Sequence, residues 1–153
     1  MRTIALMLVL ALAGCTSGEV VRTSANTMVI QTAAAPVCGG QGAIRVAQQL
    51  AAIETVRAGY DRYIITGGQA QNNVSVSQMP GSYNTAGTYG DGVYQATTTY
   101  QPGPTIVSGT HDQELAIMML REGEPGAKQA VSARDTLGSD WQEKVSKGVR
   151  TCL

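Results

Sequence analysis

Residues 41–58 read QGAIRVAQQLAAIETVRA, and this stretch does most to decide the expected fold. Its apolar residues recur at steps of three and four, and arginine, glutamine and glutamate fill the other side, which is the pattern of an amphipathic helix. Gly59 follows at the position where a glycine commonly ends a helix. The flanking segments, 27–33 (TMVIQTA) and 60–66 (YDRYIIT), are rich in residues that favour strands. The sequence therefore predicts a strand, a helix and a second strand in that order.

Beyond this second strand the chain becomes polar. Val74 and Val76 alternate with serines, which indicates a further piece of strand past a bulge at the glycines that precede it. Residues 79–110 hold six Gly, seven Thr and four of the six Tyr, with Asp91 as the only charge. Because this composition cannot bury a core of its own, we expect a long low-complexity loop inserted into the domain. A twisted hairpin turned by Gly-Asp-Gly at 90–92 is the alternative.

The last third of the chain contains three further elements. Residues 113–121 (QELAIMMLR) are apolar on both alternating faces, which favours a central strand covered on two sides. A helix is the competing interpretation, because Leu, Met and Ala are good helix formers. A helix is expected over 125–137, opened by its proline. A last helix should begin with Ser139 as N-cap and Gln142 in a capping box, and end by Gly148.

Together these elements predict an α+β fold in the order β-α-β, long loop, β-α-α. Strands linked through one helix and one long connection form a small sheet, here of three or four strands. We expect a mixed sheet with the helices on one face.

The N-terminus has the character of an export signal. A basic start (Met1-Arg2) precedes ten apolar residues, IALMLVLALA at 4–13, which are too few to span a bilayer. The following junction, Leu12-Ala13-Gly14-Cys15, resembles the lipobox of bacterial lipoproteins. The resemblance covers about the first sixteen residues, and the rest of the chain resembles no characterised family.

This resemblance implies that the signal peptide, residues 1–14, is removed and that Cys15 is acylated. Two or three acyl chains together hold a small domain on a membrane, whereas one chain anchors only weakly. By the sorting rule of the family, Thr16 favours the outer membrane. Residues 15–26 are then expected to be a lipidated tether and 27–153 a single domain with the insertion at 79–110. The alternative is an ordinary secreted protein in which Cys15 has no role.

The other two cysteines, Cys38 and Cys152, form an even pair once Cys15 is assigned to lipid. In an oxidising compartment such a pair is expected to form a disulfide. Two metal ligands are the alternative, but the sequence lacks the clustered His or Cys partners that a metal site needs.

Composition and motifs give little sign of catalysis. Eleven basic and eleven acidic residues cancel, so the chain carries no electrostatic footprint for nucleic acid. The one histidine, His111, has Asp112 and Glu114 nearby, but successive side chains on a strand diverge, and no Gly-x-Ser-x-Gly motif supplies a nucleophile. The glycines at 40 and 42 resemble a dinucleotide fingerprint without its third glycine. We therefore expect no catalytic residue, no metal site and no cofactor.

The tyrosines of the insertion are the candidate ligand contacts. They recur every five or six residues in a polar, nearly uncharged segment, at Tyr83, Tyr89, Tyr94 and Tyr100. Aromatic rings beside amides and hydroxyls can contact proteins or stack on sugars. The leading hypothesis is a non-catalytic, periplasm-facing lipoprotein of the cell envelope that binds or assembles envelope proteins. A module for peptidoglycan or another glycan is the alternative, and an enzyme built around His111 is the third.

Overall fold

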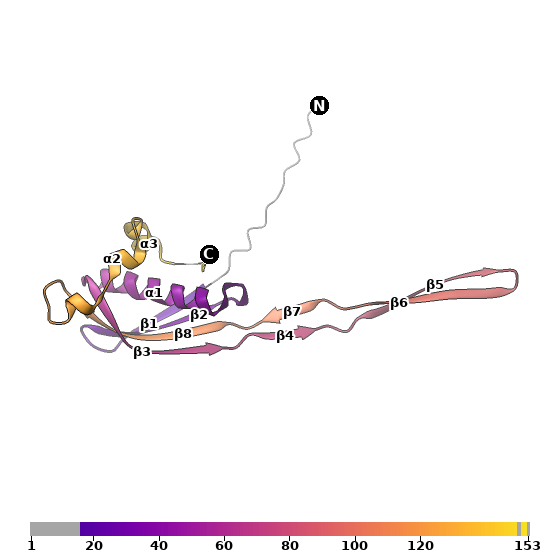
Figure 1. Ribbon diagram of the computed structural model, residues 1–153, viewed down its shortest axis with the longest axis horizontal. Coiled ribbons are helices and arrows are strands. Elements are labelled where there is room, and N and C mark those ends of the chain that lie inside the picture. The colour runs from indigo at the N-terminus through magenta and orange to yellow at the C-terminus, as the bar shows by residue number, and fades with distance from the viewer. Residues whose placement is uncertain (1–15, 150, 153) are drawn as a thin grey trace, which may run out of the picture. The chain divides into compact units, whose positions relative to one another are not determined.

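The computed structural model describes residues 16–149 and 151–152. These residues form two compact units. Unit 1 contains the described residues up to Asn73 and those from Thr110 onward, and unit 2 is Val74–Gly109. Unit 1 holds one sheet and all the helices of the described chain, whereas unit 2 holds two ribbons of two strands each (Figure 1).

The sheet of unit 1 has five strands in the order β1-β2-β8-β3-β9, and every neighbouring pair is antiparallel. The predicted mixed sheet of three or four strands is therefore wrong. β2 and β3 do run in the same direction, but β8 lies between them, so they never pair. The strands are β1 (Thr16–Arg22), β2 (Thr27–Ala34), β3 (Arg62–Asn72), β8 (His111–Leu120) and β9 (Val131–Ser132).

β1 corrects the expectation of a tether over 15–26. Thr16–Arg22 pairs along its whole length with β2. Its short polar sequence shows no clear alternation, so the pairing with β2, rather than local propensity, defines the strand. Gly18 leaves room for the end of the Leu50 side chain, which a Cβ at this position would push aside. Val20 also packs against the buried core.

The helix predicted over 41–58 is confirmed as α1 (Gly39–Arg57), which follows the short 3-10 turn η1 (Pro36–Cys38). Gly59 has a φ of 80°, as a helix-ending glycine should. Alanines dominate the buried side of α1 and let the helix approach the sheet closely. The core between them consists of Met28, Ile30, Ala51, Ala52, Ile53, Tyr60, Tyr63, Ile117, Met119, Ala133 and Leu137.

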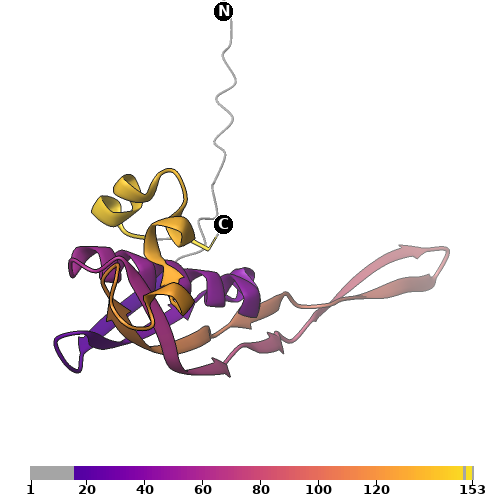
Figure 2. The same ribbon diagram turned by 60° about the vertical axis from the view of Figure 1, so that its left-hand side comes forward.

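β8 is the central strand of the sheet, as predicted from 113–121, and the competing helix is wrong. The expected cover on both faces is also wrong, because the face that points away from α1 carries an open polar hollow. Leu115, Ile117 and Met119 alternate toward the core side. The expected bulge is present, because the register between β3 and β8 shifts between Ile65 and Gly67. The two faces of the sheet differ, since the helices of unit 1 lie on one side of it (Figures 1 and 2).

The helix predicted over 125–137 is mostly wrong. Gly126 has a φ of 89°, which breaks a helix there and leaves only the 3-10 turn η2 (Ala127–Gln129). The next residues form β9 against β3, and α2 (Ala133–Leu137) starts only after Ser132, whose side chain accepts a hydrogen bond from the Asp135 amide at 3.3 Å. β3 therefore competes for this segment more effectively than helix propensity does.

The last helix, α3 (Trp141–Lys147), begins one residue later than predicted. Its N-cap is Asp140, not Ser139, and it makes no side-chain capping bond. α3 is instead held by tertiary contacts, since Arg57 Nε of α1 donates to the Val145 carbonyl at 3.0 Å. Trp141 packs against the core from its partly buried position.

Unit 2 corrects the expected long loop at 79–110. β4 (Ser75–Gln78) pairs with β7 (Thr105–Ser108), and β5 (Ser82–Gly90) pairs with β6 (Val93–Gln101). The hairpin alternative is confirmed for β5 and β6. Asp91 and Gly92 have φ angles of 51° and 78°, which is the backbone of the tight turn that joins two twisted strands. Strand pairing thus satisfies the backbone of a segment that has no core.

Candidate functional site

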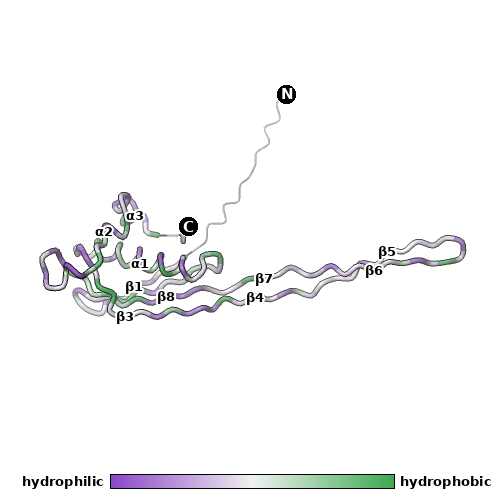
Figure 3. The backbone as a smooth tube through the Cα atoms, in the orientation of Figure 1, coloured by the Kyte–Doolittle hydropathy of each residue, from purple (hydrophilic) through white to green (hydrophobic). Residues whose placement is uncertain are grey.

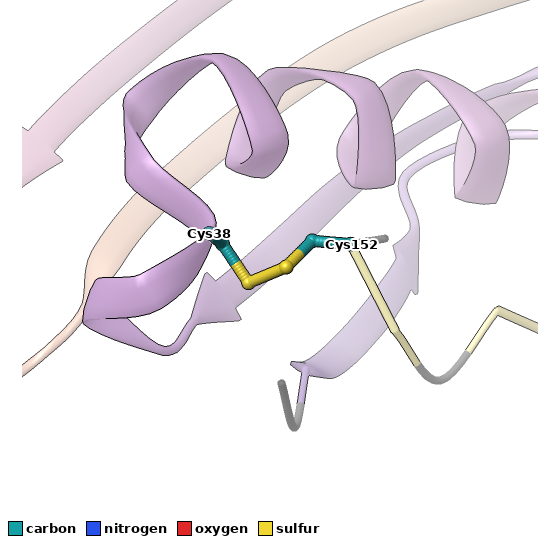
Figure 4. The surroundings of a disulfide bond; sticks show 2 residues. All are labelled: Cys38 and Cys152. Carbon is teal, nitrogen blue, oxygen red and sulfur yellow. A yellow bond between two sulfur atoms is a disulfide. The ribbon is translucent and has the colours of Figure 1, made fainter. Parts of the chain in front are cut away.

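The disulfide predicted between Cys38 and Cys152 is present, and it closes 114 residues of chain (Figure 4). Their Cα atoms lie 5.6 Å apart, with Cys38 immediately before α1 and Cys152 next to the C-terminal residue. Gly42 lies one turn into α1, where a Cβ would come within 3.1 Å of the Cys38 Cβ and 3.3 Å of the Cys152 Cβ. Gly42 therefore makes room for the disulfide. This packing explains one of the two glycines, at 40 and 42, that resemble a dinucleotide-binding motif.

Cys15, the predicted lipidation site, lies outside the described residues, as do the signal peptide and the lipobox. The described chain begins at Thr16, which is the first residue of β1. No helix within residues 16–149 is long and apolar enough to span a bilayer.

Unit 2 combines exposed apolar side chains with a near absence of charge. Asp91 is the only charged residue in it, and the tube along β5 and β6 is mostly pale, which marks intermediate hydropathy (Figure 3). Every residue of its four strands is exposed. Most of the large apolar side chains that are exposed in the described residues belong to this unit. They are Val76, Met79, Tyr83, Tyr89, Val93, Tyr94, Tyr100, Ile106 and Val107. Surfaces of this kind commonly mark interaction sites.

The four candidate tyrosines lie together on one face of the β5–β6 ribbon. Tyr83 is directly opposite Tyr100, and Tyr89 is directly opposite Tyr94. Opposite residues share a face, and positions two apart along a strand share it too, so both pairs point the same way. We call Tyr83, Tyr89, Tyr94 and Tyr100 the tyrosine face. Their side chains are between 52% and 76% exposed.

Small residues shape the tyrosine face. The rings of Tyr83 and Tyr100 are tilted by 49° with their centroids 5.0 Å apart. A side chain at Gly87 would clash with the Tyr94 ring, so this glycine lets the ring lie flat across the neighbouring strand. Between the two tyrosine pairs, the Thr85 and Thr98 hydroxyls are hydrogen-bonded at 2.8 Å.

Sequence reasoning found these tyrosines but missed their common face. The position of the turn could have predicted this face. With Asp91 and Gly92 at the centre of the turn, Tyr83 and Tyr100 lie equally far from it along the chain. Tyr89 and Tyr94 are related in the same way. The resulting surface offers two aromatic pairs about 20 Å apart along the strands, on the basis of about 3.4 Å per residue. It can stack on rings and donate phenolic hydrogen bonds without any charge preference.

Besides the tyrosine face, the structure shows a polar surface on the five-stranded sheet that the sequence did not predict. The face of the sheet that points away from α1 carries a hollow of about 850 Å³. Across it runs a row of alternating acid and amide, formed by Glu19, Gln31, Glu114 and Gln69 on neighbouring strands. Gln31 Nε2 donates to Glu114 Oε2 at 2.9 Å. No single strand shows this row, because each contributes one residue.

The structure separates the residues around His111. His111 lies opposite Ala34 and Asn72, on the α1 side of the sheet, whereas Asp112 and Glu114 face the other side. Asp112 Oδ2 accepts a hydrogen bond from Asn73 Nδ2 at 2.6 Å. Within residues 16–149 and 151–152, no three His, Cys, Asp or Glu side chains lie close enough together to hold a metal ion.

Comparison of the chain with models of protein families, with curated proteins and with solved structures finds no match. The function must therefore be inferred from the chemistry of the chain's own residues.

Proposed function

We propose that this protein is a non-catalytic lipoprotein of the bacterial cell envelope, anchored in the outer membrane through acylated Cys15 and facing the periplasm. The Cys38–Cys152 disulfide is the observation that carries the proposal. It uses two of the three cysteines, which leaves Cys15 for the lipid that the lipobox implies. A disulfide of this kind also suits an oxidising compartment rather than the cytosol.

The binding element in this proposal is unit 2. Its tyrosine face is exposed, aromatic and uncharged, and such a surface suits contacts with another envelope protein. His111 and Asp112 point to opposite faces of the sheet, so the two side chains do not form a catalytic pair.

Replacing Cys15→Ser tests the anchor. Incorporation of labelled fatty acid should fall to background, and the precursor should keep its signal peptide. Cys38→Ser is the matched control, because it removes a thiol of the disulfide and should leave labelling intact. Fatty-acid labelling of Cys15→Ser at the level of the unsubstituted protein would exclude the proposed anchor.

Substitution of Thr16 tests whether the protein is sorted to the inner or to the outer membrane. Under the sorting rule of lipoproteins, Thr16→Asp should move the protein to the inner-membrane fraction, and Thr16→Ser should leave it in the outer-membrane fraction. The readout is density-gradient separation of the two membranes. An unchanged distribution of Thr16→Asp would remove the argument for the outer membrane without affecting the argument for acylation.

Glycan binding is the second candidate, and the common face of the four tyrosines is the observation that favours it. Aromatic faces stack on sugar rings, and their hydroxyls bond to sugar hydroxyls. Retention on purified peptidoglycan should then be lost when the four tyrosines are replaced by alanine. Replacing Thr88, Thr97 and Thr99 on the other face of the ribbon is the control and should leave retention unchanged. If the tyrosine variant is retained on peptidoglycan as well as the threonine variant and the unsubstituted protein are, this candidate is excluded.

A further inference from the structure

Among the residues that the structure describes, no strand pairs with the outer edge of β6. We propose that this edge pairs antiparallel with β6 of a second copy of the same protein, so that two β5–β6 ribbons form one four-stranded sheet. This inference rests on the proposed function, since it names the partner of unit 2. Three properties of the β5–β6 ribbon favour a second copy as the partner: its low stability alone, its unprotected edge and the symmetry of β6.

The β5–β6 ribbon lacks the support that a hairpin normally needs. Two strands alone are at best marginally stable in water, and a third strand or a covering helix is usually required. All nine residues of β5 and all nine of β6 are exposed. Pairing with further strands would supply the missing hydrogen bonds and cover part of the aromatic surface.

Edge protection is present in unit 1 and absent here. Natural sheets protect their edges with charged residues, prolines or very short strands. β1 carries Glu19 and Arg22, and the other edge strand, β9, is two residues long. By contrast, β6 reads VYQATTTYQ, without a charge, a proline or a glycine. Such a strand is suited to pairing, and two uncharged copies do not repel each other.

The turn determines which backbone groups of β6 are available. The two-residue turn at Asp91 and Gly92 makes Gly90 and Val93 a hydrogen-bonded pair. Hydrogen-bonded and non-hydrogen-bonded pairs alternate along an antiparallel ladder. The amide and carbonyl groups that point away from β5 therefore belong to Tyr94, Ala96, Thr98 and Tyr100.

These four residues are arranged symmetrically about Thr97, which allows the strand to pair with itself. In an antiparallel pair centred on Thr97, Tyr94 of one copy lies opposite Tyr100 of the second copy, and Ala96 lies opposite Thr98. All four positions then form hydrogen-bonded pairs, as the direction of their backbone groups requires. A two-fold symmetric dimer needs this kind of self-complementary surface.

The same register extends the tyrosine face. Each tyrosine pair of one ribbon aligns with the opposite pair of the other, which makes two rows of four rings. Aromatic pairs directly opposite each other on a sheet are stabilising. A shift by one residue would bring the tyrosines of the second copy to the other face, so the rings also select the register. β5 is the weaker edge, because its sequence contains Gly87 and Gly90.

Cross-linking through Thr97→Cys tests the pairing in the intact, processed protein. At the centre of the proposed interface, Thr97 of each copy forms a non-hydrogen-bonded pair, in which Cβ atoms lie closest. We expect a disulfide-linked dimer on a non-reducing gel. Thr99→Cys is the matched control on the same face. It lies opposite Gln95 of the second copy and should not link to itself, but co-expressed Gln95→Cys and Thr99→Cys chains should link to each other.

Two lysine substitutions give a second, independent test, with the strength of dimerisation as the readout. Thr98→Lys and Thr85→Lys break the same hydrogen bond, but only Thr98 lies on the β6 edge. Thr98→Lys should weaken dimerisation of the detergent-solubilised protein about tenfold more than Thr85→Lys in sedimentation. Equal effects of both lysines, or linking of Thr99→Cys as efficient as that of Thr97→Cys, would overturn the proposal.

These outcomes separate the inference from the proposed function. If Cys15 is acylated and the tyrosine face retains peptidoglycan or an unrelated envelope protein, while Thr97→Cys stays monomeric, self-pairing is wrong and the binding module stands. If Cys15 is not acylated but Thr97→Cys cross-links in the same register, the pairing stands and the lipoprotein proposal is wrong.

Discussion

The bond between Cys38 and Cys152 is the residue-level feature with the largest expected effect on stability. It joins the start of α1 to the end of the chain across 114 residues. In the chain-entropy model, closing a loop of about 100 residues contributes about 4–5 kcal/mol. Cys152→Ser should therefore lower the free energy of unfolding by about this amount in a denaturant titration. The double variant Cys38→Ser/Cys152→Ser should lose no more than the single one, because both remove the same bond. A loss below about 1 kcal/mol would contradict the model.

Tyr63 gives a prediction about pH at the same scale. Its side chain is 1% exposed, and burial raises the pKa of its hydroxyl above the ordinary value of 10.0, while the hydrogen bond with Thr136 lowers it in part. The folded protein therefore holds this proton more tightly than the unfolded chain does. The resulting stabilisation is complete below about pH 10 and is lost as the pH rises through the raised pKa.

Tyr63→Phe should accordingly flatten the fall in unfolding free energy above about pH 10. At pH 7 the two proteins should differ by at most about 1 kcal/mol, because only one weak hydrogen bond is lost. The measurement is a set of denaturant titrations between neutral and alkaline pH. An equally steep alkaline loss in Tyr63→Phe would show that other groups control it.

At the scale of elements, the β5–β6 hairpin depends on its turn. Gly92 has a φ of 78°, which a β-branched residue adopts only with strain. Gly90 has no positive φ, and a Cβ added there would lie in open space. Gly92→Val should destabilise the closed hairpin by about 1–2 kcal/mol relative to the open form. Proteolysis within β5 and β6 should then be about tenfold faster. Gly90→Val is the control and should be cleaved at the original rate. Equal cleavage of the two variants would argue against this turn.

At the scale of the whole molecule, the two units should be energetically separate. The core residues described above all belong to unit 1, and the Asn73 amide donates to the Thr110 carbonyl at 2.9 Å, which brings the two ends of unit 2 together. Replacing residues 74–109 by Asn-Gly should close β3 and β8 with a tight turn. The free energy of unfolding should change by no more than about 1 kcal/mol, since no core contact is lost. A loss of several kcal/mol in a denaturant titration would mean that unit 2 supports the fold.

The accuracy of the sequence-based predictions follows the range of the interactions that define each element. The sequence predicts α1 from its apolar periodicity and β8 from a short run of apolar residues, and both signals lie within one segment. β1 and β9 were missed because each exists only through its neighbour, β2 or β3. The alternation of Val74 and Val76 with serines predicts a strand where β4 lies. Residues 79–110 instead read as a loop, because β5 and β6 bury nothing and lack the alternation of apolar and polar residues that usually marks a strand.

The amino-acid sequence by itself determined the pairing of Cys38 with Cys152, the long helix and the chemical character of the tyrosine-rich segment. These properties depend on residue type, count and short-range spacing. Only the tertiary structure decided the five-stranded antiparallel order, the polar hollow on the sheet and the common face of the tyrosines. Each of these depends on the register between strands far apart in the chain, and a register is set by backbone pairing that no single segment encodes.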